Sequence, residues 1–144
     1  MLMSLLDVQH KTRNPDYSDL DLNFTAHPTT GDVVRVKGVE AIKRSVRNLV
    51  LTNFYDRPFR SFIGSNAQKL LFDNINPMTA TFLKTAIKEV IENFEPRVRF
   101  VDPGTGDLVV RVDSEGNGYH VTINFIIINR GEPATINLFL QRIR

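Results

Sequence analysis

Three carboxylates on one predicted helix have the spacing that comes nearest to catalytic chemistry. Glu89, Glu92 and Glu95 recur every three residues, which brings them close together along a helix. Glycoside hydrolysis uses two carboxyl groups roughly 5–10 Å apart across a sugar-binding cleft, one of them with a raised pKa. Because Lys88 lies among them, we expect a solvated helix face instead. A glycosidase is therefore the weaker of the alternative functions.

Other groups that could do chemistry are sparse. The chain has no cysteine, which excludes thiolate nucleophiles, iron–sulfur clusters and cysteine-containing zinc sites. The histidines His10, His27 and His120 lack the spacing of metal ligands. We predict a protein that is not an enzyme and that has no catalytic residues, no metal and no cofactor.

Positive charge gathers in one part of the chain. Residues 33–60 carry seven basic and two acidic side chains, whereas the whole chain has a net charge of only +2. Lys43, Arg44 and Arg47 form a basic helix face, which is typical of a solvated surface but also fits phosphate or an acidic protein. A basic nucleic-acid-binding module is therefore an alternative function. It would use Lys37, Lys43, Arg44, Arg47, Arg57, Arg60, Phe54, Tyr55 and Phe59.

Two amphipathic helices are predicted to position these residues. Apolar residues at helical spacing predict the first over 39–53. The second, over 78–94, follows the capping pair Asn76-Pro77 and stops at Glu95-Pro96, because proline cannot continue a helix. Its expected apolar stripe consists of Phe82, Leu83, Ala86, Ile87, Val90, Ile91 and Phe94.

Alternation of apolar and polar residues predicts a C-terminal antiparallel sheet. Four such runs follow residue 97 and are separated by turns rich in glycine, proline and aspartate. Since two amphipathic helices can cover one face, we predict a two-layer α+β fold in which the four strands form a meander. On the other face, Ile126, Ile128 and Phe139 meet either another layer of this chain or a partner.

Length and composition predict one domain. The chain has 144 residues, of which 42% are hydrophobic, enough for a single core. Residues 7–19 show no hydrophobic period, and residues 1–19 are predicted to form a flexible arm, followed by one domain over 20–144. The apolar runs are too short to span a bilayer, and the N-terminus lacks the features of a secretory signal. We expect a cytoplasmic product without membrane contact.

The stretch from Val39 to Val98 carries a combination of short motifs that is similar to a known family. In order, these motifs are Ala41-Ile42-Lys43, Asn48-Leu49, Arg57-Pro58-Phe59 with Gly64, Leu71-Phe72-Asp73-Asn74, Asn76-Pro77-Met78-Thr79-Ala80 and Glu95-Pro96-Arg97. The chain resembles the baseplate wedge, or sheath-initiator, family of contractile-tailed bacteriophages, which has relatives in type VI secretion baseplates and R-type pyocins. After Val98 the resemblance is one of pattern more than of identity.

This resemblance implies a non-enzymatic structural protein of the virion's tail baseplate, assembled in the host bacterial cytoplasm. Some members of the family have carried a lysozyme-like label, so the weaker alternative is a lysozyme-like peptidoglycan glycosidase. The protein would dock on the wedge core and present a sheet that starts tail-sheath polymerisation. The implied partners are the tail sheath protein, other baseplate wedge proteins and, as a further candidate, the tail tube, rather than a membrane or nucleic acid. Glu95, Pro96 and Arg97 would contact the wedge core, the alternative being an internal Glu–Arg pair that shapes the turn.

Two more sets of residues receive expected roles. Sheath arms would complete the sheet, because main-chain hydrogen bonds at an edge give affinity and alternate side chains give register. Arg57-Pro58-Phe59 is interpreted as a structural loop with Phe59 in the core, the alternative being a partner contact. The residues expected to meet sheath arms are Ile126, Ile128, Thr135, Asn137 and Phe139.

Overall fold

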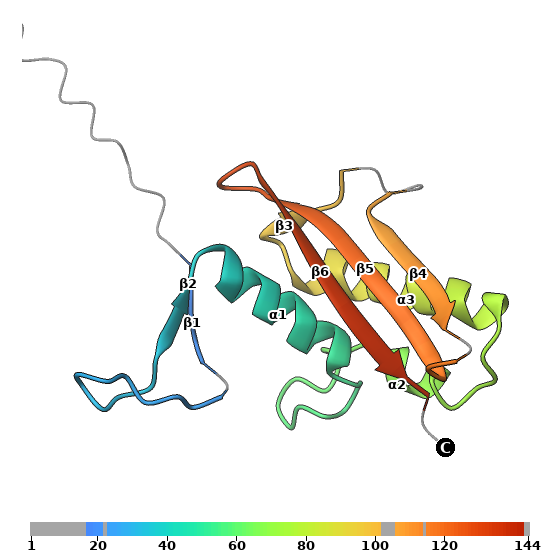
Figure 1. Ribbon diagram of the computed structural model, residues 1–144, viewed down its shortest axis with the longest axis horizontal. Coiled ribbons are helices and arrows are strands. Elements are labelled where there is room, and N and C mark those ends of the chain that lie inside the picture. The colour runs from blue at the N-terminus through green and yellow to red at the C-terminus, as the bar shows by residue number, and fades with distance from the viewer. Residues whose placement is uncertain (1–16, 22, 102–105, 114, 143–144) are drawn as a thin grey trace, which may run out of the picture.

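The chain forms short strands first, then helices, then a very short strand followed by longer ones (Figure 1). The structure is a computed structural model, and it describes residues 17–21, 23–101, 106–113 and 115–142. The elements in chain order are β1 (Ser18–Leu20), β2 (Arg35–Lys37), α1 (Val39–Leu51), α2 (Ala67–Leu70), α3 (Pro77–Phe94), β3 (Val98–Arg99), β4 (Leu108–Asp113), β5 (Gly118–Ile127) and β6 (Glu132–Gln141).

α1 turns one apolar face to the core, as its sequence pattern predicts. It begins directly after Gly38, whose φ of 64° suits a residue without a Cβ. It ends at Leu51, two residues before the predicted end, because Thr52 adopts an extended backbone. The buried residues are Ala41, Ile42, Val46, Leu49 and Val50.

α3 is fixed at both ends by local signals. Asn76 Oδ1 accepts a hydrogen bond from the Thr79 N–H at 2.7 Å, and Pro77 occupies the first turn. At the other end, Glu95-Pro96 cannot continue the helix. The helix over 77–94 therefore confirms the predicted range to within one residue.

We expect Asn76→Ala to lower the free energy of unfolding by about 1 kcal/mol, because the Thr79 N–H loses its partner. Asn76→Asp keeps an accepting oxygen and should lose much less. Urea denaturation followed by circular dichroism measures both variants. Equal losses from the two would show that the side-chain cap contributes nothing.

β5 is the central strand of the four-stranded antiparallel sheet in the described residues. β6 pairs along its full length on one edge. On the other edge, β4 pairs with the first part of β5, and β3 pairs with its last two residues. β4, β5 and β6 form the predicted meander, whereas β3 continues the edge next to β4 instead of pairing with it. The predicted two-layer α+β fold is confirmed.

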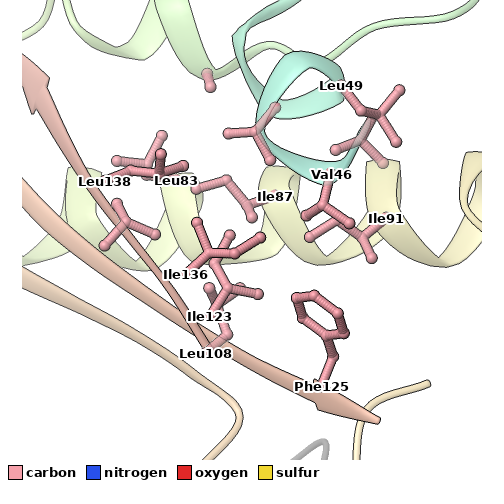
Figure 2. Packing of buried hydrophobic residues seen from close by; sticks show 14 of the residues in the cluster. Val46, Leu49, Leu83, Ile87, Ile91, Leu108, Ile123, Phe125, Ile136 and Leu138 are labelled. Carbon is pink, nitrogen blue, oxygen red and sulfur yellow. The ribbon is translucent and has the colours of Figure 1, made fainter. Parts of the chain in front are cut away.

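Both main helices pack on the same face of the sheet. Alternate residues of β5 and β6 are buried there, as a period of two requires. Phe82 was expected in this core but is 55% exposed, because it lies about 100° around α3 from Leu83. Figure 2 shows the facing side chains of Val46, Leu49, Leu83, Ile87, Ile91, Leu108, Ile123, Phe125, Ile136 and Leu138.

The first described residues form a small hairpin next to α1. β1 pairs with β2 from Ser18↔Lys37 to Leu20↔Arg35. The predicted boundary between residues 19 and 20 falls inside β1, and residues 1–16 of the predicted arm lie outside the described residues. A three-residue strand gives almost no periodic signal, so the sequence could not reveal β1.

Candidate functional site

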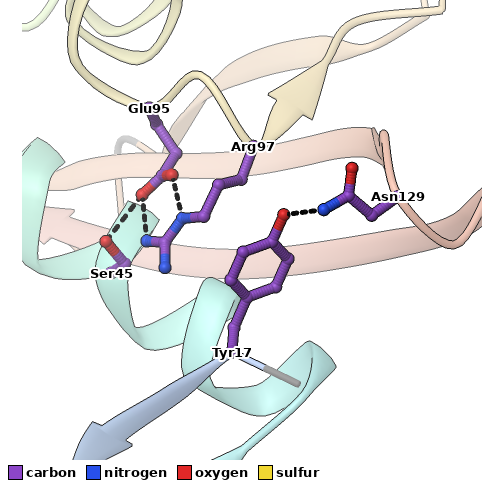
Figure 3. A network of polar contacts seen from close by, with 5 residues as sticks. All are labelled: Tyr17, Ser45, Glu95, Arg97 and Asn129. Carbon is purple, nitrogen blue, oxygen red and sulfur yellow. Dashed lines mark hydrogen bonds and ion pairs between the residues drawn. The ribbon is translucent and has the colours of Figure 1, made fainter. Parts of the chain in front are cut away.

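The turn after α3 holds a bidentate ion pair. Arg97 Nε donates to Glu95 Oε1 at 2.5 Å, and Arg97 Nη2 donates to Glu95 Oε2 at 2.7 Å. Ser45 Oγ, on α1, donates to the same Oε2 at 2.6 Å (Figure 3). Only 3% of Glu95 is exposed. Glu95-Pro96-Arg97 therefore contains the internal Glu–Arg pair that was one of its two interpretations.

Glu95 is more acidic than an ordinary glutamate. Burial by itself raises its pKa, but the hydrogen bonds from Arg97 and Ser45 and the charge of Arg97 outweigh burial, so the pKa lies below its usual value. Hydrogen bonding to Glu95 raises the pKa of Arg97. The expectation of a solvated face is therefore wrong for Glu95, although Glu89 and Glu92 are exposed.

Two more residues join this pair. The Arg97 guanidinium carbon lies 5.2 Å from the centre of the Tyr17 ring, and Asn129 Nδ2 donates to Tyr17 Oη. Segments far apart in the chain thus meet in what we call the polar corner, shown in Figure 3. Sequence reasoning missed Ser45, Tyr17 and Asn129, because none of them forms a local motif with Glu95. The polar corner consists of Tyr17, Ser45, Glu95, Arg97 and Asn129.

The predicted basic face of α1 is mostly paired within the chain. Lys43 Nζ lies 3.0 Å from Glu40 Oε1, and Arg44 binds Asp21 after the end of β1. The hydrogen bond from Arg44 lowers the pKa of Asp21. Arg47 is exposed and has no ion-pair partner among the described residues. The face therefore offers one unpaired cation instead of three.

Arg57-Pro58-Phe59 lies at the surface. All three residues are exposed, and Phe59 is almost completely so. The predicted insertion of Phe59 into the core is wrong. The Ser65 N–H donates to the Thr52 carbonyl at 2.8 Å and closes the base of the loop, so the chain between them extends away from the core.

A cleft of about 510 Å³ lies between α1, this loop and the end of α3. Arg57 and Arg60 line it from the loop, and Glu95 lines it from the polar corner. Phe62 and Phe94 supply an apolar wall, with ring centres 6.2 Å apart. The cleft therefore brings together two motifs that are far apart in the sequence.

The outer face of the sheet, away from the helices, exposes apolar side chains. Ile128 and Phe139 are about half exposed, and Ile126 is partly buried. Thr135 and Asn137 are exposed on β6 and form hydrogen bonds with β5 side chains. Of the two alternatives for this face, coverage by another layer of the described chain is wrong. A partner remains the other alternative.

The second edge of β6 is open. Among the described residues, β6 pairs with β5 alone. The Arg142 N–H donates to the Asn117 carbonyl at 2.9 Å, one step beyond the Gly118↔Gln141 pair. Because bonded and non-bonded pairs alternate in an antiparallel sheet, even-numbered residues of β6 bond to β5 and odd-numbered ones point their backbone groups outward. The outward positions are Pro133, which has no N–H, and Thr135, Asn137, Phe139 and Gln141.

The described residues contain no group of three or more side chains that could hold a metal ion. His10 lies outside these residues. His120 Nε2 lies 3.1 Å from Asp113 Oδ2. The Gly116 N–H, and after it His120, lower the pKa of Asp113 by hydrogen bonding. No helix in the described ranges is long and apolar enough to cross a bilayer.

Sequence comparison finds a matching family and a related protein. Residues 36–130 match the family described as Baseplate wedge protein gp25. Baseplate wedge protein gp25 of Enterobacteria phage T4 is 33% identical over 85 residues, which are 59% of this chain and 64% of the T4 protein. The chain therefore matches slightly less than two thirds of that relative's length.

Two solved structures share the fold. One is in the cryo-EM structure of the sixfold-symmetrised baseplate of the anti-feeding prophage, with a TM-score of 0.59, 20% identity and coverage of 90% of this chain and 88% of that one. The other is a Geobacter sulfurreducens protein provisionally named a tail lysozyme, with a TM-score of 0.64, 17% identity and coverage of 73% and 91%. At these identities the likeness concerns the fold alone.

Proposed function

The chain belongs to the Baseplate wedge protein gp25 family, and from this premise we propose that it is a non-enzymatic structural part of a contractile-tail baseplate. In this role it docks on the wedge core and offers a sheet edge to the first subunits of the tail sheath. The open edge of β6 is the observation that carries the proposal. The protein acts in the virion after assembly in the host cytoplasm.

An extended sheath arm is the partner that fits β6. An added strand pairs through main-chain hydrogen bonds, while its alternate side chains meet the neighbouring face. Thr135, Asn137 and Phe139 supply outward N–H groups, and Ile128 and Phe139 supply apolar contact on the outer face. A long exposed edge strand is otherwise prone to pair with other chains, so a sheath arm also removes that hazard.

The wedge contact is assigned to Pro96 and Arg97 of the turn after α3. Pro96 is exposed, and 30% of the Arg97 side chain is accessible. Glu95 is buried and holds the guanidinium by two hydrogen bonds, so Arg97 loses less conformational freedom when it binds. Glu95 thus positions Arg97 without itself touching the partner, which is narrower than the three-residue contact that the resemblance implies.

The alternative functions receive less support. A glycosidase needs a general acid with a raised pKa, whereas the pKa of Glu95 is lowered. A nucleic-acid-binding module needs a continuous row of free cations, whereas two of the three cations on the basic face of α1, Lys43 and Arg44, are paired with carboxylates of the same chain. These observations favour the structural role.

Replacing Thr135 and Asn137 together with proline tests strand addition. Both positions point their N–H outward, so proline removes donors from the open edge and none from the pairing with β5. In pull-downs with the full-length chain, we expect this variant to lose binding to the purified sheath protein of the same tail. Binding to the wedge proteins should survive.

The matched control replaces the same two residues with valine, which changes the side chains and keeps the amides. We expect this control to bind the sheath protein, and circular dichroism checks that both variants are folded. Sheath binding by a folded proline variant would contradict strand addition. Equal loss in the valine control would assign the contact to side chains, and no binding of the wild type to either partner would favour the nucleic-acid alternative.

A further inference from the structure

The loop between α1 and α2 carries the two most exposed aromatic side chains in the described residues. Residues 54–62, here called the aromatic loop, expose 99% of Phe59, 80% of Tyr55 and 63% of Phe62. Clustered exposed apolar side chains mark interaction sites. We propose that the aromatic loop is a docking surface for a second baseplate protein, which presents an apolar socket flanked by carboxylates. This inference rests on the proposed place in a baseplate, but not on sheath binding.

The aromatic loop is held in one shape by its own backbone. The Tyr55 N–H donates to the Ser61 carbonyl at 2.8 Å, and the Asn53 N–H donates to Asp56 Oδ2 at 2.8 Å. At the base, a Cβ on Gly64 would lie 2.4 Å from the Asn53 carbonyl carbon, so only glycine fits this close approach. Tyr55 keeps a φ of 73°, which is unfavourable for a side-chain-bearing residue. A preorganised loop of this kind loses little entropy on binding.

Two hollows border the aromatic loop and set it off as a ridge. One is the cleft that Arg57 and Arg60 line, and the other, of about 420 Å³, is lined by Tyr55 and Lys69. Phe62 lines both hollows. An apolar ridge between hollows is complementary to a partner with an apolar socket and raised walls on either side.

The charge of the ridge indicates which charge the partner's surface carries. Arg57 and Arg60 have no ion-pair partner among the described residues, and the Arg60 N–H donates to the Arg57 carbonyl at 3.2 Å, which places both on one turn. Two neighbouring guanidinium groups bind carboxylates bidentately. Aromatic and arginine side chains are also the residues that dominate binding energy at protein interfaces. The complementary surface is therefore acidic and apolar.

Nucleic acid fits this surface less well. A phosphate backbone is bound by a row of cations along its length. Of the cations of α1 that would continue such a row, Lys43 and Arg44 already pair with Glu40 and Asp21, which leaves Arg47 alone. What remains is a short cationic spot beside an aromatic tip, which matches a protein segment.

Photocrosslinking from position 59 identifies the protein that binds the aromatic loop. The full-length chain with p-benzoylphenylalanine at position 59 is assembled into its baseplate, irradiated, and the crosslinked peptide is sequenced by mass spectrometry. We expect a peptide of another baseplate protein in which the crosslinked site is apolar and has aspartate or glutamate neighbours. Crosslinks to nucleic acid, to the sheath protein, to this chain or a second copy, or to a peptide without acidic residues would overturn the proposal. No crosslink in a baseplate that contains the chain would do the same.

Substitutions test the aromatic and the cationic part of the surface separately, by the affinity for the baseplate protein found by crosslinking. Phe59→Ala should weaken binding by about 30-fold, whereas Phe82→Ala, another exposed aromatic on α3, should change it little. The double variant Arg57→Gln/Arg60→Gln should bind at least about tenfold more weakly and lose most of the salt dependence that the wild type shows. The control Lys84→Gln should keep both the affinity and the salt dependence of the wild type. Equal effects from the matched controls would overturn the proposal.

The proposal for β6 and the proposal for the aromatic loop can be refuted independently of each other. The Thr135→Pro/Asn137→Pro variant should keep the crosslink from position 59, and Phe59→Ala should keep sheath binding. Loss of the crosslink in the folded proline variant would overturn the aromatic loop as an independent surface. If the proline variant loses sheath binding and Phe59→Ala does not, strand addition is supported. The crosslink from position 59 then decides whether the aromatic loop is a docking surface.

Discussion

Replacing Phe125 with alanine is expected to lower the free energy of unfolding by about 3–5 kcal/mol. Phe125 is 1% exposed and points from β5 into the core between the sheet and the helices (Figure 2). Alanine leaves a cavity there and loses the contacts of the ring. Against a typical total of about 5–15 kcal/mol, this loss removes much of the stability, and urea denaturation followed by circular dichroism measures it.

Phe139→Ala is the matched control, because it removes the same side chain from the neighbouring strand β6. Phe139 lies on the outer face and is 46% exposed, so the expected loss is below about 1 kcal/mol. Equal losses from the two variants would contradict the assignment of the helices to one face of the sheet.

Arg97→Ala is expected to cost about 3 kcal/mol at neutral pH. The Glu95 carboxylate is buried, and without the guanidinium it loses two hydrogen bonds and keeps the one from Ser45. The partial exposure of Arg97 puts the expected cost at the lower end of the range for buried pairs. Urea midpoints at pH 7 and about pH 4 measure this effect.

The pH dependence of this loss has a definite sign. In the wild type, the pKa of Glu95 is lower in the folded than in the unfolded state, so the pair stabilises the fold fully above about pH 5 and less as the pH falls through the folded-state pKa. In Arg97→Ala, burial raises the pKa of Glu95, and acidification relieves the penalty. The difference between the two proteins should therefore shrink at low pH.

Glu95→Met combined with Arg97→Met is the control for Arg97→Ala. Replacing both partners leaves no unpaired buried charge, and such replacements are often close to neutral. We expect this double variant to be more stable at pH 7 than Arg97→Ala. A loss in Arg97→Ala that grows on acidification would contradict the account of Glu95.

The sequence predicts those parts of the fold that are encoded locally. Asn76-Pro77 starts α3 and Glu95-Pro96 ends it, because capping and the missing proline N–H act within one turn. The strand alternation of β5 and β6 is equally local. The two-layer arrangement follows from these elements, since each must bury one face.

The site is less predictable because its contacts are distant in the sequence. Ser45 and Glu95 lie 50 positions apart. Arg44 pairs with Asp21, and no local motif predicts this pair. Phe59 was expected in the core. Its true place is decided by hydrogen bonds at the base of the loop, and these depend on how α1 and α2 meet.

The sequence pattern places proline in the turns between strands, but Pro133 lies in β6 opposite Ile126. Proline is excluded from a strand only where its N–H is needed. Whether position 133 needs one depends on the pairing register, and residue types alone do not give that register.

The outward position of Pro133 also limits how a strand can slide along β6. A strand lying over 135–141 finds an outward N–H at every second residue, whereas one shifted by two residues toward the β5–β6 turn meets proline and gives up one hydrogen bond. A hydrogen bond of this kind is worth about 0.5–1.5 kcal/mol, which is up to roughly a tenfold preference between the two alignments. Pro133 thus acts as a stop that favours one alignment of any arriving strand, before the side chains of that strand contribute.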